Sequence, residues 1–255
     1  MNIFGVHAVE EALALAPGAR VLWVDEAKEG DKRFKRCMAR ARGRALEIKY
    51  GDRRTLDKLA AGGKHQGVVL DAGEYAYTPI EDFLEGVEGA KQVCVVILDG
   101  VQDVGNFGAV ARSAAALGAD AILMARDRSC EVTPGAMRAS AGQLWRIPVI
   151  QVTNLSRALD DLKAAGFWVG STGVVQGEQA SLWQAPLSGR LGMVLGSEHD
   201  GVRKLVAKKC DFGVWIPMSP GVESLNVSAA AAVVLAEIAR RRHVASAQEQ
   251  KDAPT

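Results

Sequence analysis

The sequence predicts an α/β protein in which a small α/β unit precedes a larger unit built on a parallel sheet. Short apolar runs rich in Val, Ile and Leu alternate with segments of helical spacing along most of the chain. An acidic, glycine-containing stretch at 73–91 interrupts this alternation and separates the two units. With 255 residues, of which 48% are hydrophobic and 24% charged, the chain is long enough to fold around a substantial core.

The first unit is predicted to occupy residues 1–72. Its apolar runs predict three strands, at 21–25, 45–48 and 67–71. Apolar residues at helical spacing predict three helices, at 6–16, 31–42 and 53–61. Residues 73–91, which contain one short amphipathic segment, are expected to form a linker.

The second unit is predicted to occupy residues 92–243. Strands are expected at six continuous apolar runs, 93–99, 121–125, 147–152, 167–174, 191–196 and 212–218. Helices are expected at 106–117, 155–165, 202–209 and in a long terminal segment, and a turn at 133–136. Buried strands separated by helices are typical of a parallel sheet covered on both faces. The tail, residues 244–255, has too little apolar content to pack and is expected to be disordered.

The composition disfavours several classes of protein. The formal net charge is +1, so no overall field points to nucleic acid, although a local patch can still bind it. The four cysteines lie far apart without C-x-x-C or histidine spacing, which disfavours a zinc site and a disulfide framework, and no metal is expected. No apolar run approaches the roughly 20 residues of a membrane helix, and no leader pattern is visible. We therefore expect a cytoplasmic protein without a membrane partner.

One segment of the first unit is strongly basic. Residues 28–58 contain twelve Lys or Arg against five Asp or Glu. In the helix predicted there, one apolar face is formed by Phe34, Cys37, Met38 and Ala41. The opposite face carries Arg33, Arg36 and Arg40. These arginines form either a solvated helix face or a surface that contacts RNA phosphates, and the sequence leaves both interpretations open.

The first of three polar clusters lies in "LDGVQDVGNFGAVARSAAALGAD", where a strand and a glycine-containing loop lead into a helix carrying Arg112. This arrangement suggests a dinucleotide site, but the G-x-G-x-x-G fingerprint fails because Asp103 stands two residues before Gly105. Asp99 and Asp103 would also repel a pyrophosphate, and the chain has no G-K-[ST] phosphate loop. Arg112 either extends past the core or points into the loop mouth, where its fork would suit a phosphate or a carboxylate.

The other two polar clusters are "LGMVLGSEHDGV" and "SPGVESLN". In the former, an apolar strand ends in Gly196, Ser197 and Glu198, which form either a solvated turn or a loop that approaches a ligand closely. In the latter, Ser224 and Asn226 stand at the start of the terminal helix, where each is a helix cap or part of a site. If the three strands are neighbours, their loops converge on one crevice. The sequence alone does not show that adjacency.

Taken together, the clusters resemble a known family. "NFGAVARSA", "LGSEHDGV" and "IPMSPGVESLNVSAA", in this order, resemble the three motifs of the SpoU (TrmH-type) RNA ribose 2′-O-methyltransferases. "IFGVHAVEEAL" and "HQGVVLD" are similar to the substrate-binding domain of those members that act on a 23S rRNA guanosine. Three ordered motifs are far more specific than one, and the tail alone is unmatched.

The resemblance implies a SPOUT fold, in which the C-terminal chain forms a deep trefoil knot, preceded by a domain like ribosomal protein L30e. It implies that the protein binds S-adenosylmethionine in the knot, works as a homodimer, and methylates a guanosine ribose in 23S rRNA, at the peptidyl-transferase P loop. By position, the catalytic residues it implies are Arg112, Asn106, Glu198, Ser224 and Asn226. The cofactor-binding residues it implies are Thr172, Gly173, Leu195, Gly196, Ser197, Gly201, Ile216 and Leu225.

Roles for three of these residues follow as hypotheses. Arginine keeps its proton near neutral pH and is a poor base, so Arg112 is expected to bind the target phosphate and stabilise charge that develops on the ribose oxygen. Asn226 is expected to fix the geometry of the loop and the cofactor, and Ser224 to orient the target nucleotide. Two alternatives stay open: a tRNA ribose 2′-O-methyltransferase of the same fold, and a non-catalytic RNA-binding protein of ribosome assembly.

Overall fold

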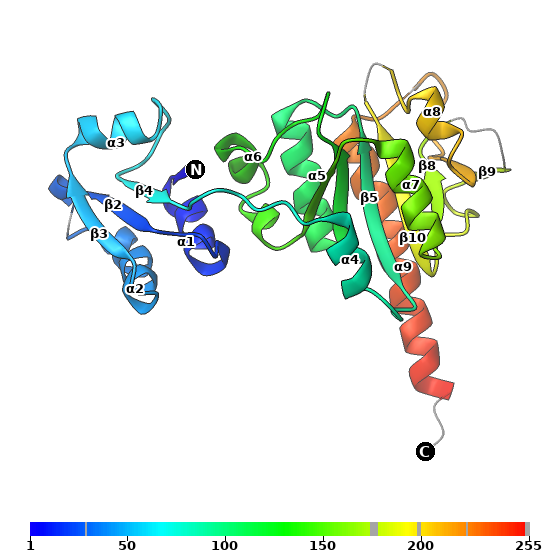
Figure 1. Ribbon diagram of the computed structural model, residues 1–255, viewed down its shortest axis with the longest axis horizontal. Coiled ribbons are helices and arrows are strands. Elements are labelled where there is room, and N and C mark those ends of the chain that lie inside the picture. The colour runs from blue at the N-terminus through cyan, green and yellow to red at the C-terminus, as the bar shows by residue number, and fades with distance from the viewer. Residues whose placement is uncertain (29, 174–177, 198–199, 223, 253–255) are drawn as a thin grey trace. The chain divides into compact units, whose positions relative to one another are not determined.

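The computed structural model describes residues 1–28, 30–173, 178–197, 200–222 and 224–252, with side chains as far as residue 245. The chain divides into two compact units, each with its own sheet. The first unit consists of Met1–Ala76 and Val132–Arg146, and the second of Tyr77–Glu131 and Ile147–Thr255. Figure 1 shows the strands and helices of each unit.

The first unit has a four-stranded mixed sheet in the order β1-β4-β2-β3. β4 is antiparallel to β1 and β2, whereas β2 and β3 are parallel. The strands are β1 (Asn2–Phe4), β2 (Val21–Asp25), β3 (Glu47–Gly51) and β4 (Val68–Asp71). The helices near this sheet are α1 (Val6–Leu15), α2 (Lys35–Gly43) and α3 (Arg53–Leu59). Three residues are too few to show a period, so the apolar pattern does not predict β1.

Within the basic segment, the helix predicted at 31–42 forms a short 3-10 turn, Lys32–Phe34, followed directly by α2. Asp31 starts this segment because its carboxylate accepts a hydrogen bond (2.9 Å) from the backbone N–H of Arg33. The predicted apolar face packs inward, with three fully buried side chains: Phe34, Cys37 and Ala41. The opposite face of α2 therefore carries its arginines toward solvent.

The segment at 133–136, where the sequence predicts a turn, begins a helix instead, α6 (Pro134–Ala139). The hydroxyl of Thr133 accepts a hydrogen bond (3.2 Å) from the backbone N–H of Ala136, and Pro134 occupies the first turn of the helix. Both features favour a helix start, because the cap satisfies a free N–H and proline needs no donor there. The turn prediction is therefore wrong.

The second unit has a seven-stranded sheet in the order β7-β6-β5-β10-β8-β11-β9. The pairings among its described strands are all parallel. The strands are β5 (Val93–Asp99), β6 (Ala121–Ala125), β7 (Val149–Val152), β8 (Trp168–Ser171), β9 (Glu178–Ser181), β10 (Arg190–Gly196) and β11 (Phe212–Trp215). The predicted class, α/β with a parallel sheet, is confirmed.

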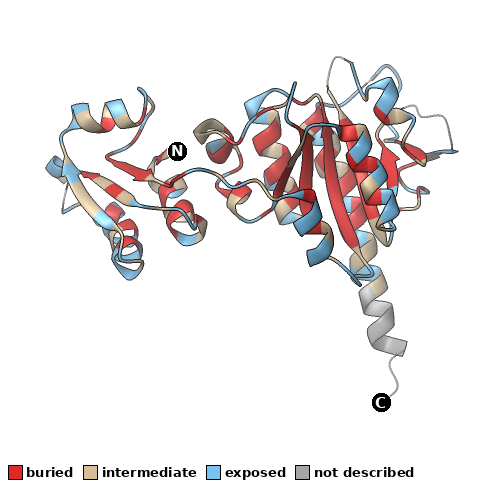
Figure 2. Ribbon diagram, in the orientation of Figure 1, coloured by how far each residue is buried: buried red, intermediate tan, exposed pale blue. Residues whose placement is uncertain are grey.

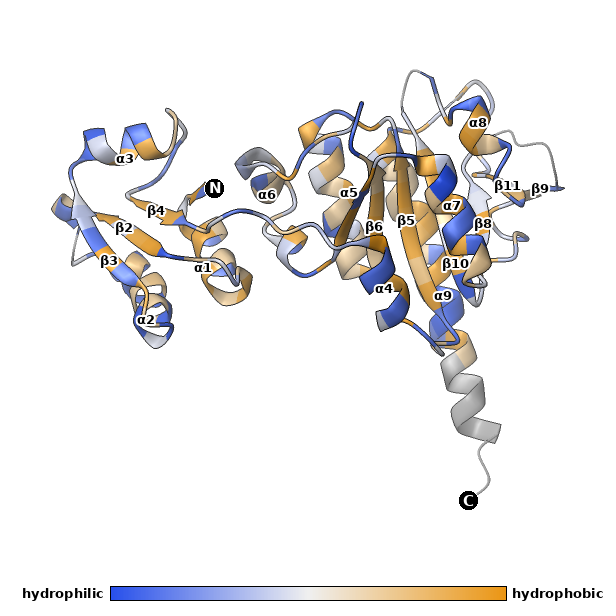
Figure 3. Cartoon of the chain, viewed as in Figure 1, coloured by the Kyte–Doolittle hydropathy of each residue, from blue (hydrophilic) through white to orange (hydrophobic). Residues whose placement is uncertain are grey.

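Helices cover both faces of this sheet. α4 (Ile80–Gly86) and α7 (Leu155–Ala164) lie on one face, and α5 (Val104–Ala116) and α9 (Val227–Asp252) pack together on the other (Figure 1). The inner strand β5 is buried along its whole length, as Figure 2 shows. The inner strands β5 and β6 also carry strongly apolar sequence (Figure 3), which explains why continuous runs predict them.

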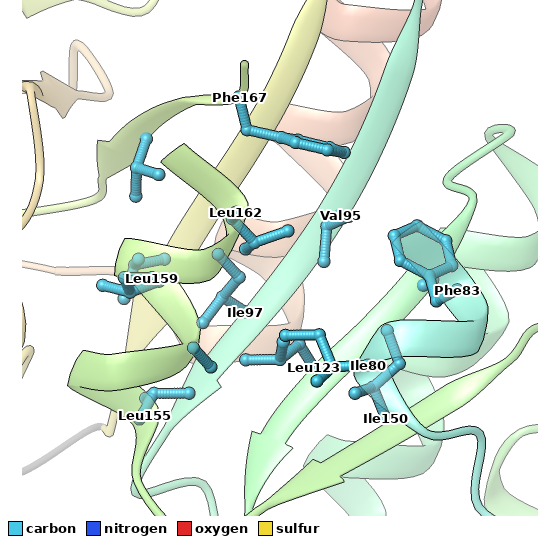
Figure 4. Close-up of a cluster of buried hydrophobic side chains, with 14 of the residues drawn as sticks. Ile80, Phe83, Val95, Ile97, Leu123, Ile150, Leu155, Leu159, Leu162 and Phe167 are labelled. Carbon is cyan, nitrogen blue, oxygen red and sulfur yellow. The ribbon is translucent and has the colours of Figure 1, made fainter. Parts of the chain in front are cut away.

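The core between the sheet and its first helical layer is shown in Figure 4. Val95 and Ile97 of β5 point to the same side, as alternate residues of a strand do, and share one cluster with Leu159 and Leu162 of α7. Ile80 and Phe83 of α4 join the same cluster. Burying a side chain of this size contributes about 1.5–3 kcal/mol. The stretch expected to be a linker therefore supplies a helix to the core of the second unit.

The terminal helix α9 packs against α5 with its first half. Four apolar side chains at helical spacing are buried there: Ala231, Val234, Leu235 and Ile238. The helix continues to Asp252 and so covers most of the segment for which the composition predicts disorder. Alanine, glutamine and glutamate are good helix formers, and a helix already nucleated by packing can extend through them.

Some chemical features follow from burial. All four cysteines are buried free thiols. Desolvation raises the pKa of Cys94 and Cys210 to about 12, so these thiols stay protonated near neutral pH. Of the helices in the described ranges, none combines the length and apolarity needed to cross a bilayer. The same ranges contain no group of three His, Cys, Asp or Glu placed to hold a metal.

Candidate functional site

A cavity of about 290 Å³ opens at the carboxyl ends of β8, β10 and β11. The carboxyl ends of parallel strands are where open α/β sheets bind ligands. All the residues predicted to hold the cofactor line this cavity: Thr172, Gly173, Leu195, Gly196, Ser197, Gly201, Ile216 and Leu225. Ser224, predicted to be catalytic, lines it as well. We call this space the first cavity.

The floor of the first cavity is built from backbone. β10 pairs with β5 so that Gly196 lies opposite Asp99. The chain then turns sharply: the N–H of Ser197 donates to the carbonyl of Gly201 (3.1 Å), and the N–H of Gly201 donates back to Ser197 (3.0 Å). A Cβ placed on Gly196 would lie 2.2 Å from the carbonyl carbon of Gly201. Only glycine therefore fits at this strand end.

The walls of the first cavity are uncharged. Of the described residues that line it, none carries a charged side chain. β11 and the segment after it contribute apolar surface through Trp215, Ile216 and Met218. Trp215 and Met218 remain 54% and 40% exposed. Such a lining suits a ligand with a planar apolar part that bonds to backbone groups rather than to a counter-ion.

A second cavity, of about 340 Å³, adjoins the first. Ser197 and Val227 line both. The second cavity is polar, because Gln102, Asp103 and Asn106 face it from the loop after β5 and the start of α5. The first and second polar clusters of the sequence therefore meet at one place.

The third polar cluster joins them through Asn226. Its amide Nδ2 donates a hydrogen bond (3.0 Å) to Oδ1 of Asn106, which is 120 residues away in the chain. Its Oδ1 accepts from the backbone N–H (2.9 Å) and the hydroxyl (2.6 Å) of Ser228, so Asn226 also caps α9. On the other side, Asp103 caps α5 by accepting from the N–H of Asn106 (2.7 Å). Two helix starts are thus locked together beside the cavities.

Two family models match this chain. The SpoU rRNA methylase family matches residues 93–236, and the RNA 2′-O ribose methyltransferase substrate-binding domain matches residues 2–78. The chain belongs to the SpoU rRNA methylase family. The resemblance predicted from the three motifs, and with it the methyltransferase class, is confirmed.

Named relatives agree with this assignment. The chain is 40% identical over 245 residues to the 23S rRNA (guanosine-2′-O-)-methyltransferase RlmB of Xanthomonas campestris, covering 94% of this chain and 96% of the relative. It is 39% identical over 241 residues to an uncharacterized tRNA/rRNA methyltransferase of Mycobacterium avium, covering 94% and 77%. The solved SpoU methyltransferase AviRb of Streptomyces viridochromogenes, in complex with AdoMet, matches with a TM-score of 0.77 at 24% identity, covering 96% of this chain and 91% of that one. At this identity the likeness concerns the fold.

Not every SpoU motif residue reaches the cavities. Arg112 lies on α5, is exposed, and makes no hydrogen bond or ion pair with the described residues. It lines neither cavity. Glu198 lies outside the described residues. Asn106, Ser224 and Asn226 are therefore the predicted catalytic residues that the structure brings together.

Asp99, the last residue of β5, forms a structural ion pair. Its carboxylate is fully buried and does not face a ligand. Oδ1 accepts from Nε of Arg203 (2.6 Å), and Oδ2 accepts from the backbone N–H of the same residue (2.8 Å). The ion pair ties the start of α8 (Lys204–Ala207) to the end of β5. Sequence patterns do not indicate Arg203, because 104 residues separate it from its partner.

The predicted RNA-binding arginines lie in the first unit and differ in their contacts. Arg33 is bound to the carboxylate of Asp31 through Nε (3.0 Å) and Nη2 (2.5 Å), and this contact lowers the pKa of Asp31 to about 2. Arg40 donates to the carbonyl of Glu10 (2.6 Å). Arg36 is exposed and has no hydrogen bond or ion pair within the described chain. Arg36 is therefore the least constrained of the three.

The sequence did not point to several lining residues. The first cavity also contains Val214, Trp215, Met218, Val227 and Ala230. Gln102 and Asp200 line the second cavity. A tryptophan at the end of an apolar strand, just before a predicted ligand-binding residue, is the signal that could have identified Trp215. The others needed the sheet order.

Proposed function

We propose that the protein transfers a methyl group from S-adenosylmethionine to the ribose 2′-hydroxyl of a guanosine in 23S rRNA, at the peptidyl-transferase P loop. The observation that carries this proposal is the pair of adjoining cavities, which share Ser197 and Val227. A donor in one and a nucleoside in the other would lie side by side. Holding both reactants in line can supply roughly 7–11 kcal/mol of the barrier.

The first cavity suits S-adenosylmethionine. Its apolar side chains, including Leu195, Ile216 and Leu225, can flank an adenine ring, and its glycine backbone allows close approach. The uncharged lining would leave a positively charged sulfonium without a competing cation. When bound, the cofactor supplies an electrophilic methyl group.

The side chains around the second cavity hold and orient the target nucleoside. Asn106 and Gln102 offer amide groups that can bond to sugar or base atoms. Ser224 lines the first cavity and orients the target nucleotide. Asn226 acts one step back: through its bond to Asn106 it fixes the wall between the two helix starts.

Arg112 lies outside both cavities, so the RNA has to bring the target nucleotide to it. It binds the phosphate of that nucleotide and stabilises negative charge on the ribose oxygen as the proton leaves. Its exposed place on α5 is compatible with a contact to RNA, and its planar fork suits a phosphate. Arg112→Ala is expected to lower the single-turnover methylation rate by roughly 100-fold, the scale for one lost charge-stabilising donor. Arg112→Lys keeps the charge but not the fork, so it should be nearly as slow. A lysine variant with most of the wild-type rate would contradict the bidentate role.

We infer that the protein works as a homodimer with RNA lying across both subunits. Apolar side chains are exposed at the start of α5 and in the segment before α9: Val104, Met218, Val222 and Leu225. A second copy would cover such surface. Sedimentation equilibrium of the wild type and of Val222→Glu would detect a dimer and its loss.

The trefoil knot stays a prediction. It is supported by the return of the chain after β11 to the loop that follows β10, since Leu225 and Gly201 line the same cavity. The seven-stranded sheet also places β10 between β5 and β8, which precede it in the chain.

The test is ribose-methylation mapping of rRNA and tRNA from cells that lack this protein. One guanosine of the 23S P loop should lose its 2′-O-methyl group, and the wild-type gene should restore it. An unchanged rRNA pattern with a lost tRNA methylation would favour the tRNA alternative. Isothermal titration of the purified protein with S-adenosylmethionine is the second arm, because a non-catalytic RNA-binding protein should release no heat.

A further inference from the structure

A third cavity opens at the same carboxyl edge of the second unit's sheet and has no part in the proposed chemistry. Its volume is about 470 Å³, and it lies between the ends of β6 and β7 and the starts of α7 and α8. We call it the basic groove, because Arg128, Arg203 and Lys204 line it against one lining carboxylate, Asp127.

The charges in the basic groove are available to a ligand. Arg128 and Lys204 form no ion pair or hydrogen bond with any described residue, and both are exposed. Arg203 is held in place by the buried Asp99, yet 42% of its side chain is exposed. A guanidinium has five N–H donors, so the pair with Asp99 leaves some of them free. The groove thus offers two unpaired cations and one fixed arginine.

The backbone of the groove also favours an anionic ligand. Asn154 caps α7 by accepting from the N–H of Arg157 (3.1 Å), which leaves the N–H groups of Leu155 and Ser156 without a partner in the described chain. These donors sit at the positive end of a ten-residue helix. Arg128 has a φ of 57°, a conformation uncommon for a residue other than glycine. Cations, free N–H groups and a strained arginine together match a phosphate.

We propose that the basic groove binds backbone phosphates of the substrate RNA next to the methylated nucleotide. β6 is the neighbour of β5, and the loop after β5 lines the second cavity. The groove and the second cavity therefore follow the carboxyl ends of adjacent strands, which lie about 4.8 Å apart. An RNA chain seated in the second cavity has to leave it, and the groove is a positively charged exit along the same edge. This inference rests on the proposed function for the identity of the ligand.

The experiment compares Arg128→Gln/Lys204→Gln with the wild type, leaving Arg203 intact because its loss would leave Asp99 buried without a partner. Lys91→Gln is the control, because Lys91 is exposed and precedes β5 at the opposite, amino edge of the sheet. RNA affinity is measured by fluorescence anisotropy on a labelled 23S P-loop hairpin at several salt concentrations, and methylation by kcat and KM. Heat of S-adenosylmethionine binding reports whether each variant is folded.

The double variant should bind RNA roughly tenfold more weakly at 150 mM salt, with an unchanged kcat and unchanged cofactor affinity. Each lost phosphate contact should also lower the slope of log affinity against log salt by about 0.7. The control should match the wild type in all of these. Equal RNA affinity and equal slope for the double variant and the wild type would overturn the inference. Binding of labelled polyglutamate is measured in the same way as a probe for an acidic protein. A double variant that loses polyglutamate binding but keeps RNA binding would also overturn the inference.

Failure of the proposed function looks different. If the wild type binds the hairpin through the groove but methylates no RNA, the groove survives and the methyltransferase assignment of this substrate falls. If the wild type methylates the hairpin and the double variant does so with the same KM, the methyltransferase assignment survives and the groove is not an RNA-binding site.

Discussion

The first cavity and the arginine face of α2 differ in how they can recognise a ligand. The first cavity is uncharged in its described lining and is shaped by backbone contacts such as that between Gly196 and Gly201. The α2 face is exposed and charged, while Cys37 and Ala41 on the other side of the helix are buried. Binding in the first cavity depends on shape, so one added atom should abolish it. Binding on the α2 face depends on charge, so each removed arginine should weaken it by a modest amount.

The largest expected effect comes from Gly196→Ala. The new Cβ would meet the backbone of Gly201, which cannot move without breaking the two hydrogen bonds that close the turn. We expect S-adenosylmethionine affinity to fall by at least about 100-fold and methylation to become undetectable. Titration calorimetry and methylation of the P-loop hairpin measure both.

Gly192→Ala is the matched control on the same strand. Its Cβ would meet the Cδ1 atom of Ile97 at 2.9 Å, a side-chain end in the core that can shift. This variant should lose stability but keep cofactor affinity. If Gly196→Ala bound the cofactor as the wild type does, the view of the cavity as a shape-dependent site would be wrong.

A smaller effect is expected on the α2 face. Arg36→Ala should weaken RNA binding several-fold, because the donors of Arg36 are free. The slope of log affinity against log salt should fall by the amount expected for about one phosphate contact. Arg33→Ala should change the slope less, since Asp31 already holds its Nε and Nη2. Both variants remove one charge, so the pair separates a direct phosphate contact from the long-range field. Equal slopes for the two would indicate that only the field matters.

The fold was more predictable from sequence than the site. Continuous apolar runs locate β5 and β6 at the residues where they occur, because strands buried on both faces leave a strong local signal. β9 is missed because Glu178–Ser181 is short and polar and pairs at the edge of the sheet. α6 is missed because six residues show no helical period, although Thr133 and Pro134 are typical residues for a helix start. The order of the strands is not predictable from periodicity, which carries no information on distant pairing.

The site required long-range contacts that no local pattern contains. The motifs could be recognised by resemblance, but the bond between Asn226 and Asn106 and the pair of Asp99 with Arg203 each join residues more than a hundred positions apart. From its position at a helix start, Asn226 is either a helix cap or part of a site, and only the resemblance to the SpoU motifs favours the site. The structure shows that the cap and the contact with the first motif are made by opposite ends of one amide. The basic groove likewise arises from three separate segments, at 125–128, 153–156 and 203–206.

The smallest functional effect, and a test of the scaffold under the first cavity, is expected from Glu237→Gln. Glu237 is 7% exposed on α9 and accepts from Arg240 (2.8 Å) and Arg241 (2.7 Å), and hydrogen bonds from Arg240 first, then Arg241, lower its pKa from 4.5 to about 2. Arg241 in turn donates to the carbonyl of Trp183 (2.8 Å), after β9, which pairs with β11 at the cavity wall. Because the folded pKa lies below the unfolded one, the charged form stabilises the fold above about pH 4.5, and this stability is lost as the pH falls toward 2.

We therefore expect Glu237→Gln to lower the free energy of unfolding by about 2 kcal/mol at pH 7, and the difference from the wild type to shrink between pH 4.5 and 2. Urea unfolding across that pH range measures it, with the exposed Glu88→Gln as the control that should show no such dependence. Cofactor affinity at pH 7 should change less than twofold, because the variant removes a support and no cavity atom. A loss of affinity as large as that of Gly196→Ala would mean that the cavity is not shaped by its own backbone but is held open from α9.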